Sequence, residues 1–408
     1  MAASAFPFHL MAKPVGNTCN LACDYCFYLE KGAVYAGPPR LMDDELLEAY
    51  IHSTFNAQPK GAEITFTWQG GEPTLAGLEF FEKAVALQSK LAEGRKYGNS
   101  FQTNGLLIDG RWADFLARHD FLVGLSLDGP ADLHDIHRRT PGGEGSHSRV
   151  MRAFDLLKRR GVAVNILCCV TRSNQDRALE LYQFFRESGV EFIQFIPVLE
   201  RRPGEAARRS GLRLGCPDSA GEPTPWSAGG LEYGRFLTDI FMVWVKRDVG
   251  KIFIMNFEWA LANYLGLPGA ACHHQPLCGR CPVLEHDGSV YACDHYVYPG
   301  HRLGDLRSGP LTALVDHRRQ WDFGEVKKSL GARCRDCPFL RGCWGGCPKH
   351  RFVVEEEEPQ NYFCPGYRHF YQKILPFLQA LAHLHRQGRP LSDITGLTLV
   401  LAGREARP

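Results

Sequence analysis

The chain has 408 residues, a length that fits two or three domains of about 150 residues each. Its hydrophobic content of 44% and charged content of 23% are those of a folded globular protein. Forty-seven basic and forty-five acidic residues leave a net charge of +2, which argues against nucleic-acid binding through bulk charge. No apolar run approaches the roughly 20 residues that cross a bilayer, and the N-terminus lacks the pattern of a signal peptide. The sequence therefore predicts a cytoplasmic protein that does not bind a membrane.

Strand-like and helix-like segments alternate along the first half of the chain. This alternation predicts parallel β–α–β units, and about six fit, fewer than the eight of a full TIM barrel. The predicted strands cover residues 8–15, 63–69, 101–103, 122–128, 162–170 and 192–198. The predicted helices begin near Glu45, with Asp43 or Asp44 as cap, and cover residues 78–92, 149–160 and 179–187.

The second half of the chain has a different character. Residues 200–230 are rich in Gly, Pro, Arg and Ser and are predicted to form a loop. Five arginines between Arg201 and Arg213 are expected on a solvated surface, with substrate guidance as the alternative. Helices are predicted at 232–245 and 370–386, and the glutamates at 355–358 are expected in a solvated loop.

These patterns divide the chain into four parts. We expect a partial (β/α)6 barrel of α/β class at 1–235 and a helical linker at 236–271. A small cysteine-rich domain should follow at 272–370, with a C-terminal helix and tail at 371–408.

The chain contains fifteen cysteines, and they are clustered. Without an export signal a disulfide framework is not favoured, and cytosolic cysteine clusters more often bind metal or carry out redox chemistry. Cys19, Cys23 and Cys26 have the spacing CxxxCxxC. Three thiolates on one loop can hold three irons of a [4Fe–4S] cube and leave the fourth iron open to an outside ligand. Structural zinc is the alternative, but it usually takes four closed ligands, and the nearest histidine is His9.

A second motif follows the predicted strand at 63–69. It reads Gly70-Gly71-Glu72-Pro73; glycines allow close backbone approach, and a carboxylate can accept a hydrogen bond from an ammonium group. With CxxxCxxC upstream, the chain resembles the radical S-adenosylmethionine superfamily, in which GGEP holds the methionine amino group. This resemblance implies further contacts to S-adenosylmethionine from Tyr25, Gln102, Ser126, Asp128 and Arg149.

The later cysteines resemble the SPASM extension of radical enzymes that modify peptides, which carries two auxiliary [4Fe–4S] clusters. The resemblance assigns one cluster to Cys272, Cys278, Cys293 and Cys347, and the other to Cys334, Cys337, Cys343 and Cys364. Eight thiolates make two fully ligated cubes, although two Cys₄ zinc sites are not excluded by spacing. Cys281 is surplus to the pattern and is expected to be a free thiol.

Longer segments of the sequence narrow the resemblance from the superfamily to one family within it. The segments KPVGNTCNLACDYCFYLEK, TFTWQGGEPTLAGLEFF, LVGLSLDGP and LEHDGSVYACDHYVYP are similar to the anaerobic sulfatase-maturating enzymes. That family oxidises a Cys or Ser of an unfolded sulfatase segment, in a Cys/Ser-x-Pro-x-Arg motif, to Cα-formylglycine. The resemblance implies three [4Fe–4S] clusters, S-adenosylmethionine, and an electron donor of the flavodoxin or ferredoxin type.

The resemblance also implies catalytic residues. Asp294, directly after Cys293, is expected to be the base that takes the substrate proton, and His295 is the competing candidate. A role for Asp294 in capping a turn is the structural alternative. Tyr28 and Gln69 match positions that line the active site in the family.

Two other functions remain open at this point. The first is radical crosslinking or epimerisation of another ribosomal peptide. Such enzymes often carry a precursor-recognition domain before the first cluster, and we expect none in the short stretch before Cys19. The second is a zinc scaffold without catalysis. A monomer is expected, because nothing in the pattern requires a partner chain.

Overall fold

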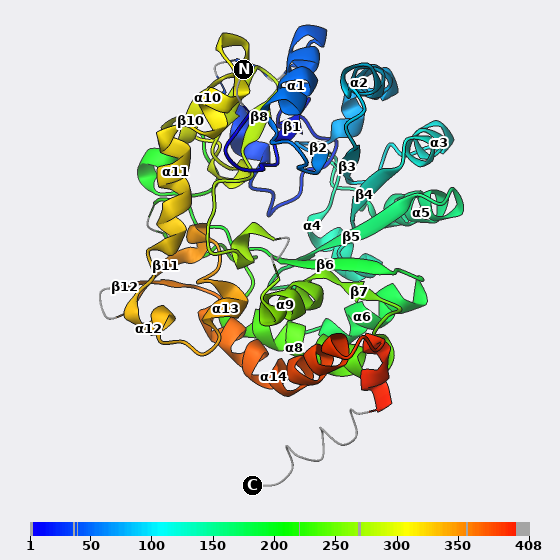
Figure 1. The fold of residues 1–408 in the computed structure, drawn as a ribbon, viewed down its shortest axis with the longest axis vertical. Coiled ribbons are helices and arrows are strands. Elements are labelled where there is room, and N and C mark those ends of the chain that lie inside the picture. The colour runs from blue at the N-terminus through cyan, green and yellow to red at the C-terminus, as the bar shows by residue number, and fades with distance from the viewer. Residues whose placement is uncertain are drawn as a thin grey trace.

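The computed structural model describes residues 3–35, 37–38, 40–219, 221–267, 271–355 and 358–396. Within them, ten strands form one sheet in the order β10-β9-β8-β1-β2-β3-β4-β5-β6-β7. Strands β1 to β7 pair in parallel, so their carboxyl ends meet at one edge. Figure 1 shows that the sheet curves into an incomplete barrel with helices on its outer side.

All six strands predicted from the sequence are confirmed. They are β1 (Met11–Lys13), β2 (Ile64–Trp68), β3 (Tyr97–Thr103), β4 (Phe121–Ser126), β5 (Ala163–Val170) and β6 (Phe192–Pro197). A short β7 (Phe253–Ile254) extends the sheet beyond β6. Strand β3 begins before the predicted residue 101 because its polar Asn99 is satisfied in the core, where Trp68 Nε1 and Gln88 Nε2 both donate to it at 2.9 Å.

The four helices predicted between these strands are also confirmed. They are α1 (Asp44–Ala57), α2 (Leu78–Leu91), α5 (His147–Arg159) and α6 (Ala178–Glu187). Asp43 is the cap of α1, and its carboxylate accepts from the Leu46 amide at 2.9 Å. Helices α3 (Gly110–Arg118) and α4 (Ala131–His137) were not foreseen.

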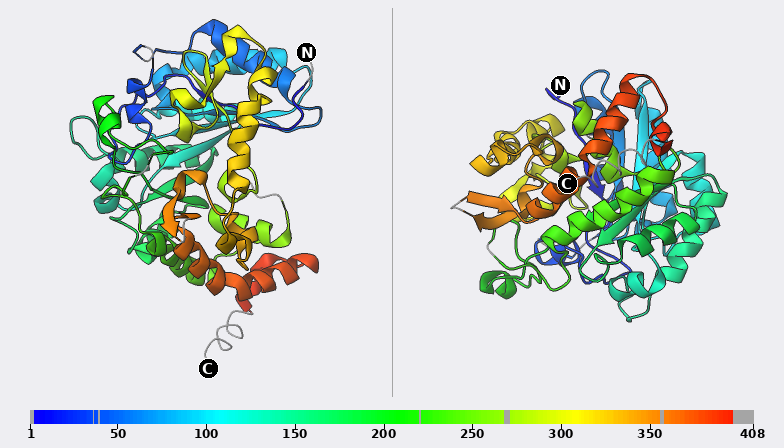
Figure 2. Two further views of the ribbon diagram at one scale, coloured as in Figure 1. Left: turned by 90° about the vertical axis from the view of Figure 1, so that its left-hand side faces the viewer. Right: turned by 90° about the horizontal axis from the view of Figure 1, so that it is seen from below.

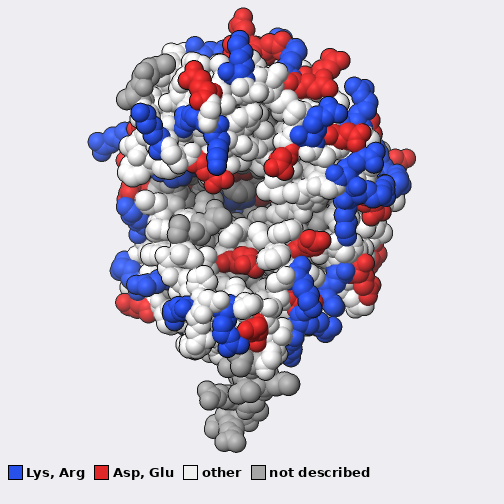
Figure 3. All heavy atoms as spheres, turned by 45° about the vertical axis from the view of Figure 1, so that its right-hand side comes forward, with Lys and Arg blue, Asp and Glu red and all other residues white. Residues whose placement is uncertain are grey.

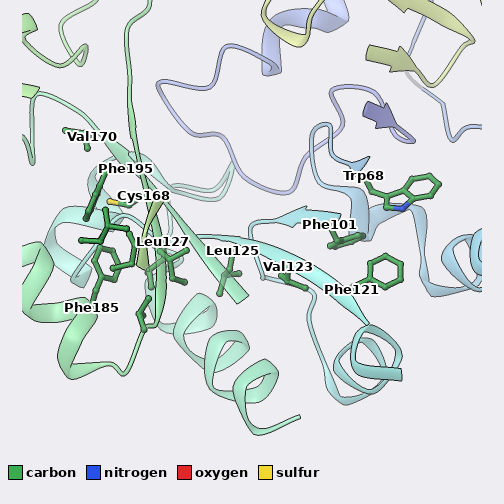
Figure 4. Close-up of a cluster of buried hydrophobic side chains, with 14 of the residues drawn as sticks. Trp68, Phe101, Phe121, Val123, Leu125, Leu127, Cys168, Val170, Phe185 and Phe195 are labelled. Atoms are coloured by element: carbon green, nitrogen blue, oxygen red, sulfur yellow. The ribbon is translucent and has the colours of Figure 1, made fainter. Parts of the chain in front are cut away.

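The main core lies between the sheet and the outer helices. Because side chains alternate along a strand, every second residue points toward the helices. The rings of Trp68, Phe81 and Phe101 meet edge to face on this side, with centroids 5.1–5.4 Å apart. Figure 4 shows this layer continuing through Phe121 and Val123 toward the far strands. The opposite face of the sheet carries polar side chains. One example is the hydrogen bond that Ser100 Oγ donates to Thr67 Oγ1 at 2.9 Å.

The cysteine-rich region contributes three strands to the same sheet. β8 (Val283–Glu285) pairs in parallel with β1, and β9 (Ser289–Tyr291) and β10 (Arg302–Asp305) follow in antiparallel order. Short helices come next: α10 (Leu311–Val315), α11 (Arg318–Glu325), α12 (Ala332–Arg335) and α13 (Leu340–Cys343). Figures 1 and 2 show this yellow and orange region beside the side on which the barrel is incomplete.

The acidic run at 355–358 was predicted as a solvated loop, and this is wrong at both ends. β11 (Arg351–Glu355) pairs antiparallel with β12 (Glu358–Asn361), and the Glu358 carboxylate accepts from the Ala332 amide at 2.9 Å. Glu356 and Glu357 lie outside the described residues.

The arginine-rich segment at 200–230 is largely irregular, as predicted, with one short helix, α7 (Glu205–Arg209). The expectation of a solvated surface fails for Arg201, which is only 5% exposed. Its guanidinium donates to the Pro217 and Ser219 carbonyls and lies 4.8 Å from the centre of the Phe352 ring. These contacts replace water as partners, so this arginine fixes the segment against the cysteine-rich region.

Two long helices cover the lower end of the molecule as it is drawn in Figure 1. α8 (Gly230–Arg247) and α14 (Cys364–Arg386) pack at a close crossing, where a Cβ on Gly234 would lie 2.1 Å from the Gly366 carbonyl oxygen. α9 (Met255–Leu265) packs beside them. Each long helix crosses one of the expected domain boundaries, at residues 235 and 370 respectively.

The outer surface carries both signs of charge. In Figure 3, Lys and Arg side chains stand beside Asp and Glu side chains, and the face is hollowed near its middle. No helix in the described part of the chain has the length and apolar character that a bilayer crossing requires.

Candidate active site

The three cysteines of the first motif lie on the loop that follows β1. The Leu21 amide donates to Cys19 Sγ at 3.4 Å, and Asn104 Nδ2 approaches the same sulfur at 3.8 Å. Burial raises the pKa of the Cys19 thiol to about 12. Iron binding displaces such a proton, and the polar N–H groups around the sulfur suit a cluster ligand.

The glycines of the second motif lie directly against the cysteine loop. The Gly71 amide donates to the Gly16 carbonyl at 2.8 Å, and the Glu72 amide donates to the Thr18 carbonyl at 2.9 Å. A Cβ on Gly71 would lie 2.0 Å from the Thr18 carbonyl oxygen. Only glycine fits at this approach, so the two motifs form one backbone unit.

Glu72 is buried and accepts hydrogen bonds from several donors of the protein. Its carboxylate accepts from the Asn104 amide at 2.8 Å, from Thr103 Oγ1 at 2.7 Å and from Thr74 Oγ1 at 2.6 Å. Burial raises the pKa of Glu72 despite these bonds. The side chain thus ties GGEP to residues 103 and 104, at the carboxyl end of β3.

Asp128 is the centre of a buried network after β4. It accepts from Tyr25 Oη at 2.5 Å, from Arg138 Nε at 2.8 Å and from the Cys169 amide at 2.8 Å. Burial alone would raise the pKa of Asp128, but Arg138 and His134 outweigh it and hold the pKa below the ordinary value. The network therefore anchors the cysteine loop, through Tyr25, to the barrel.

Arg138 was missed by the sequence analysis, although its ion pair with Asp128 is buried. It lies in the run His137-Arg138-Arg139 at the end of α4, a helix that was itself not predicted. The pattern offers no signal that distinguishes this arginine from its exposed neighbour.

The other expected contacts to S-adenosylmethionine lie at the same edge of the barrel. Gln102 and Ser126 are at the carboxyl ends of β3 and β4, and Gln69, which was expected to line the active site, follows β2. Arg149 is in the first turn of α5, and its guanidinium lies 3.4 Å from the Leu106 carbonyl. Carboxyl ends of parallel strands are where barrel enzymes place their sites.

Asp294 follows Cys293 in the chain and is the first residue of a single 3-10 turn, Asp294–Tyr296. The Cys293 sulfur lies 3.5 Å from Oδ1 of the Asp294 carboxylate. Burial would raise the pKa of Asp294, but the nearby His295, Lys13 and Lys349 lower it, so the carboxylate is ionised. Burial and Lys349 lower the pKa of His295. A lowered pKa leaves each side chain able to accept a proton, so these shifts do not decide between Asp294 and His295.

Tyr28 belongs to a buried network that the sequence analysis did not foresee. Its hydroxyl donates to the Glu285 carboxylate, and Tyr35 Oη donates to the same group at 2.9 Å. The ammonium of Lys13 lies 3.9 Å from the centre of the Tyr28 ring. Lys13 and Glu285 are partners in the β1–β8 pairing. The network therefore connects the cysteine loop to the cysteine-rich region.

One cavity brings together all four cysteines assigned to the second auxiliary cluster. Cys334, Cys337, Cys343 and Cys364 line it, together with the side chains of Tyr367 and Tyr371. Four thiols around one space match the donor set of a fully ligated cube.

The four cysteines assigned to the first auxiliary cluster also lie close together. Burial raises the pKa of the Cys272 thiol, and negative charge on Cys281, Cys347 and Cys278 adds to that effect. Burial also raises the pKa of Cys293, with smaller contributions from Asp294, Cys272 and Cys347. Cys281 is in the same neighbourhood. Among the described residues, no three His, Cys, Asp or Glu side chains converge on one point as a single metal ion would require. A cube takes one thiolate per iron, so its ligands surround a volume instead.

Family models place these features in known families. The radical SAM superfamily model matches residues 14–199, and the iron-sulfur cluster-binding SPASM model matches residues 274–338. With the partial barrel and the clustered cysteines, they define a radical S-adenosylmethionine enzyme that carries a SPASM extension.

Curated relatives identify the family within that class. A serine-type anaerobic sulfatase-maturating enzyme of Bacteroides thetaiotaomicron is 40% identical over 92% of this chain and 91% of its own length. A cysteine-type enzyme of Clostridium perfringens is 34% identical over 92% of this chain and 99% of its own length. The solved structure of native anSMEcpe with bound AdoMet and Cp18Cys peptide has a TM-score of 0.81 and 34% identity, covering 92% of this chain and 99% of that one. The chain belongs to the anaerobic sulfatase-maturating enzymes.

Proposed function

We propose that this protein oxidises a Cys or Ser residue of an unfolded sulfatase segment to Cα-formylglycine. The observation that carries the proposal is the position of Asp294. This carboxylate follows an auxiliary-cluster ligand directly, and the ring of the next residue, His295, packs 4.5 Å from the ring of Phe27, which follows Cys26. This contact between the two cysteine regions supports a proton acceptor close to both.

The chain supplies ligands, orientation and a base. When bound, the clusters and S-adenosylmethionine supply low-potential electron transfer and radical hydrogen abstraction. We assign the open cluster to Cys19, Cys23 and Cys26, with the GGEP turn and the Tyr25–Asp128–Arg138 network beside it. Asp294 accepts the proton of the substrate hydroxyl or thiol as the adjacent Cβ loses hydrogen. The remaining electron would pass to the auxiliary clusters held by the two sets of four cysteines. A Ser substrate then gives the aldehyde directly, and a Cys substrate gives a thioaldehyde that water hydrolyses with release of sulfide. Tyr28 and Gln69 line the substrate space.

The remaining assignments complete the proposal. The target lies in a Cys/Ser-x-Pro-x-Arg motif, and a low-potential electron donor of the flavodoxin or ferredoxin type supplies electrons. The enzyme works as a monomer in the cytoplasm, where cysteines stay reduced; none of its fifteen cysteines, all of which lie in the described ranges, forms a disulfide in the structure. The division into a barrel at 1–235, a linker at 236–271, a SPASM domain at 272–370 and a C-terminal part at 371–408 remains our working description.

The Asp294→Asn variant tests this assignment. Anaerobic enzyme is incubated with dithionite, S-adenosylmethionine and a peptide that carries the Cys motif, and products are read by mass spectrometry. The variant should still form 5′-deoxyadenosine but lose at least about 100-fold in aldehyde, the scale of general-base catalysis. Wild-type aldehyde yield from the variant would contradict the role of Asp294.

A further inference from the structure

A buried ion pair connects the end of the barrel to the cysteine-rich region. Lys349 Nζ lies 2.5 Å from Glu200 Oε1, and the two side chains are only 7% and 8% exposed. Glu200 follows β6, and Lys349 lies two residues after Cys347. Burying two charges costs free energy that their attraction repays only in a good geometry, so such a pair is weak evidence for stability alone.

The backbone on both sides of the pair is held in place. The Glu200 amide donates to Ser227 Oγ at 3.1 Å, and its carbonyl accepts from the Thr224 amide at 2.8 Å. The Lys349 carbonyl accepts from the Arg201 guanidinium at 3.3 Å. The pair therefore joins two fixed segments rather than two mobile side chains.

The ammonium of Lys349 also faces the active site. It lies 5.1 Å from the centre of the Phe27 ring, within the range of a cation–π contact. The Phe27 ring packs against the His295 ring with a centroid distance of 4.5 Å. Phe27 directly follows Cys26, and His295 directly follows Asp294. One row of contacts thus runs from Glu200 through Lys349 and Phe27 to His295.

We propose that Glu200 and Lys349 are positioning residues, which hold the 293–295 segment against the loop that carries Cys26. This inference rests on the proposed function. Oxidation of one residue needs hydrogen removal at Cβ and proton removal at the neighbouring heteroatom, so the two groups responsible must reach the same side chain. Displacement of either by about 1 Å is enough to lower the yield strongly. Loss of the pair should therefore separate S-adenosylmethionine cleavage from peptide oxidation.

The test compares Glu200→Gln with a matched control, Asp44→Asn. Asp44 forms a similar ion pair with Lys83, at 2.8 Å, but on the outer surface, where the side chains are 71% and 55% exposed. The measured quantity is 5′-deoxyadenosine formed per aldehyde, with iron content and backbone hydrogen exchange recorded on the same samples. Glu200→Gln should keep its iron, raise the ratio at least about threefold and speed exchange at residues 293–297, and Asp44→Asn should change none of these.

A wild-type ratio and wild-type exchange in Glu200→Gln would overturn the inference. If that variant loses iron, Glu200→Asp decides, because it keeps the charge but shortens its reach by one methylene. An intermediate ratio would then support the inference, and a wild-type ratio would overturn it. Absence of aldehyde from the wild-type enzyme would contradict the proposed function instead, and exchange at 293–297 would still decide the role of the pair.

Discussion

Gly71 shows how one residue fixes the spacing of two motifs. Replacing it with alanine would place a Cβ 2.0 Å from the backbone oxygen of Thr18, and backbone atoms cannot move aside as a flexible side chain can. We expect Gly71→Ala to lower the free energy of unfolding by about 3 kcal/mol, the upper range for overpacking. It should also lose roughly four irons, one cube, because the loop of Cys19 must shift.

Denaturant unfolding and iron analysis of the purified variant check this prediction. Gly98 is the matched control, because a Cβ there meets no atom within 4 Å. Gly98→Ala should keep the wild-type iron content. Full iron and unchanged stability in Gly71→Ala would contradict the proposed fit between GGEP and the cysteine loop.

The buried ion pair of Asp128 and Arg138 should make the free energy of unfolding depend on pH. Removing one partner of a buried pair costs about 3–5 kcal/mol, because it leaves an unpaired charge, so Asp128→Asn should be destabilised by that amount at pH 7. The pKa of Asp128 is lowered in the folded state. The stabilisation is therefore fully present above the unfolded aspartate pKa of about 3.9 and is lost as the pH falls through the lower folded pKa.

Unfolding curves of wild type and Asp128→Asn, measured from pH 7 down to pH 3, test the sign of this effect. The gap in stability should stay constant above about pH 5 and narrow below about pH 4. A gap that widens on acidification would show that Asp128 is not the ionised partner of Arg138.

At the scale of elements, what the sequence could reveal depended on periodicity. The strands β1 to β6 lie in apolar or β-branched segments and the four helices between them have apolar repeats, so they were predicted within a few residues. Helix α4 has only seven residues, too few turns for such a repeat. Helix α3 does carry one, at Trp112, Phe115 and Leu116, and this signal was overlooked. The pairing of β8 with β1 joins residues some 270 positions apart in the sequence. Strand β8 has only three residues, too few for a pattern that would predict this pairing.

The residues of the candidate site also fall into two groups, those that a local sequence motif predicts and those that only tertiary contacts identify. Cysteine spacing and the GGEP turn are local signals, and the structure groups those residues as one would expect of a site. Arg138, Lys13 and Glu285 act through tertiary contacts, and a buried charge looks like a surface charge in a sequence. Arg201 is a further example of the same error, since its Gly-, Pro- and Ser-rich context predicted a surface position although the side chain is buried.

At the scale of the whole molecule, we expect that removing the cysteine ligands of one cluster lowers the iron content by the four irons of that cluster alone. Wild type should bind about twelve irons, from three four-iron cubes. The double variant Cys334→Ala/Cys337→Ala removes two thiols from one cavity and should bind about eight irons. It should still cleave S-adenosylmethionine, because the thiols of Cys19, Cys23 and Cys26 are on a different loop.

Iron and sulfide analysis after anaerobic reconstitution gives the count. Cys216→Ala is the control, since this half-buried thiol lies in the 200–230 segment and belongs to neither auxiliary set. Loss of all iron in the double variant would mean that the two regions do not bind clusters independently.

The central claim is that the whole fold brings radical chemistry and a base to one peptide residue. The most direct measurement uses wild-type enzyme under anaerobic conditions with dithionite, S-adenosylmethionine and two matched peptides, one with Cys and one with Ser in the sulfatase motif. Mass spectrometry should find Cα-formylglycine in at least one peptide, in equal amount to 5′-deoxyadenosine. Formation of 5′-deoxyadenosine by an iron-replete enzyme, with both peptides unchanged, would contradict it.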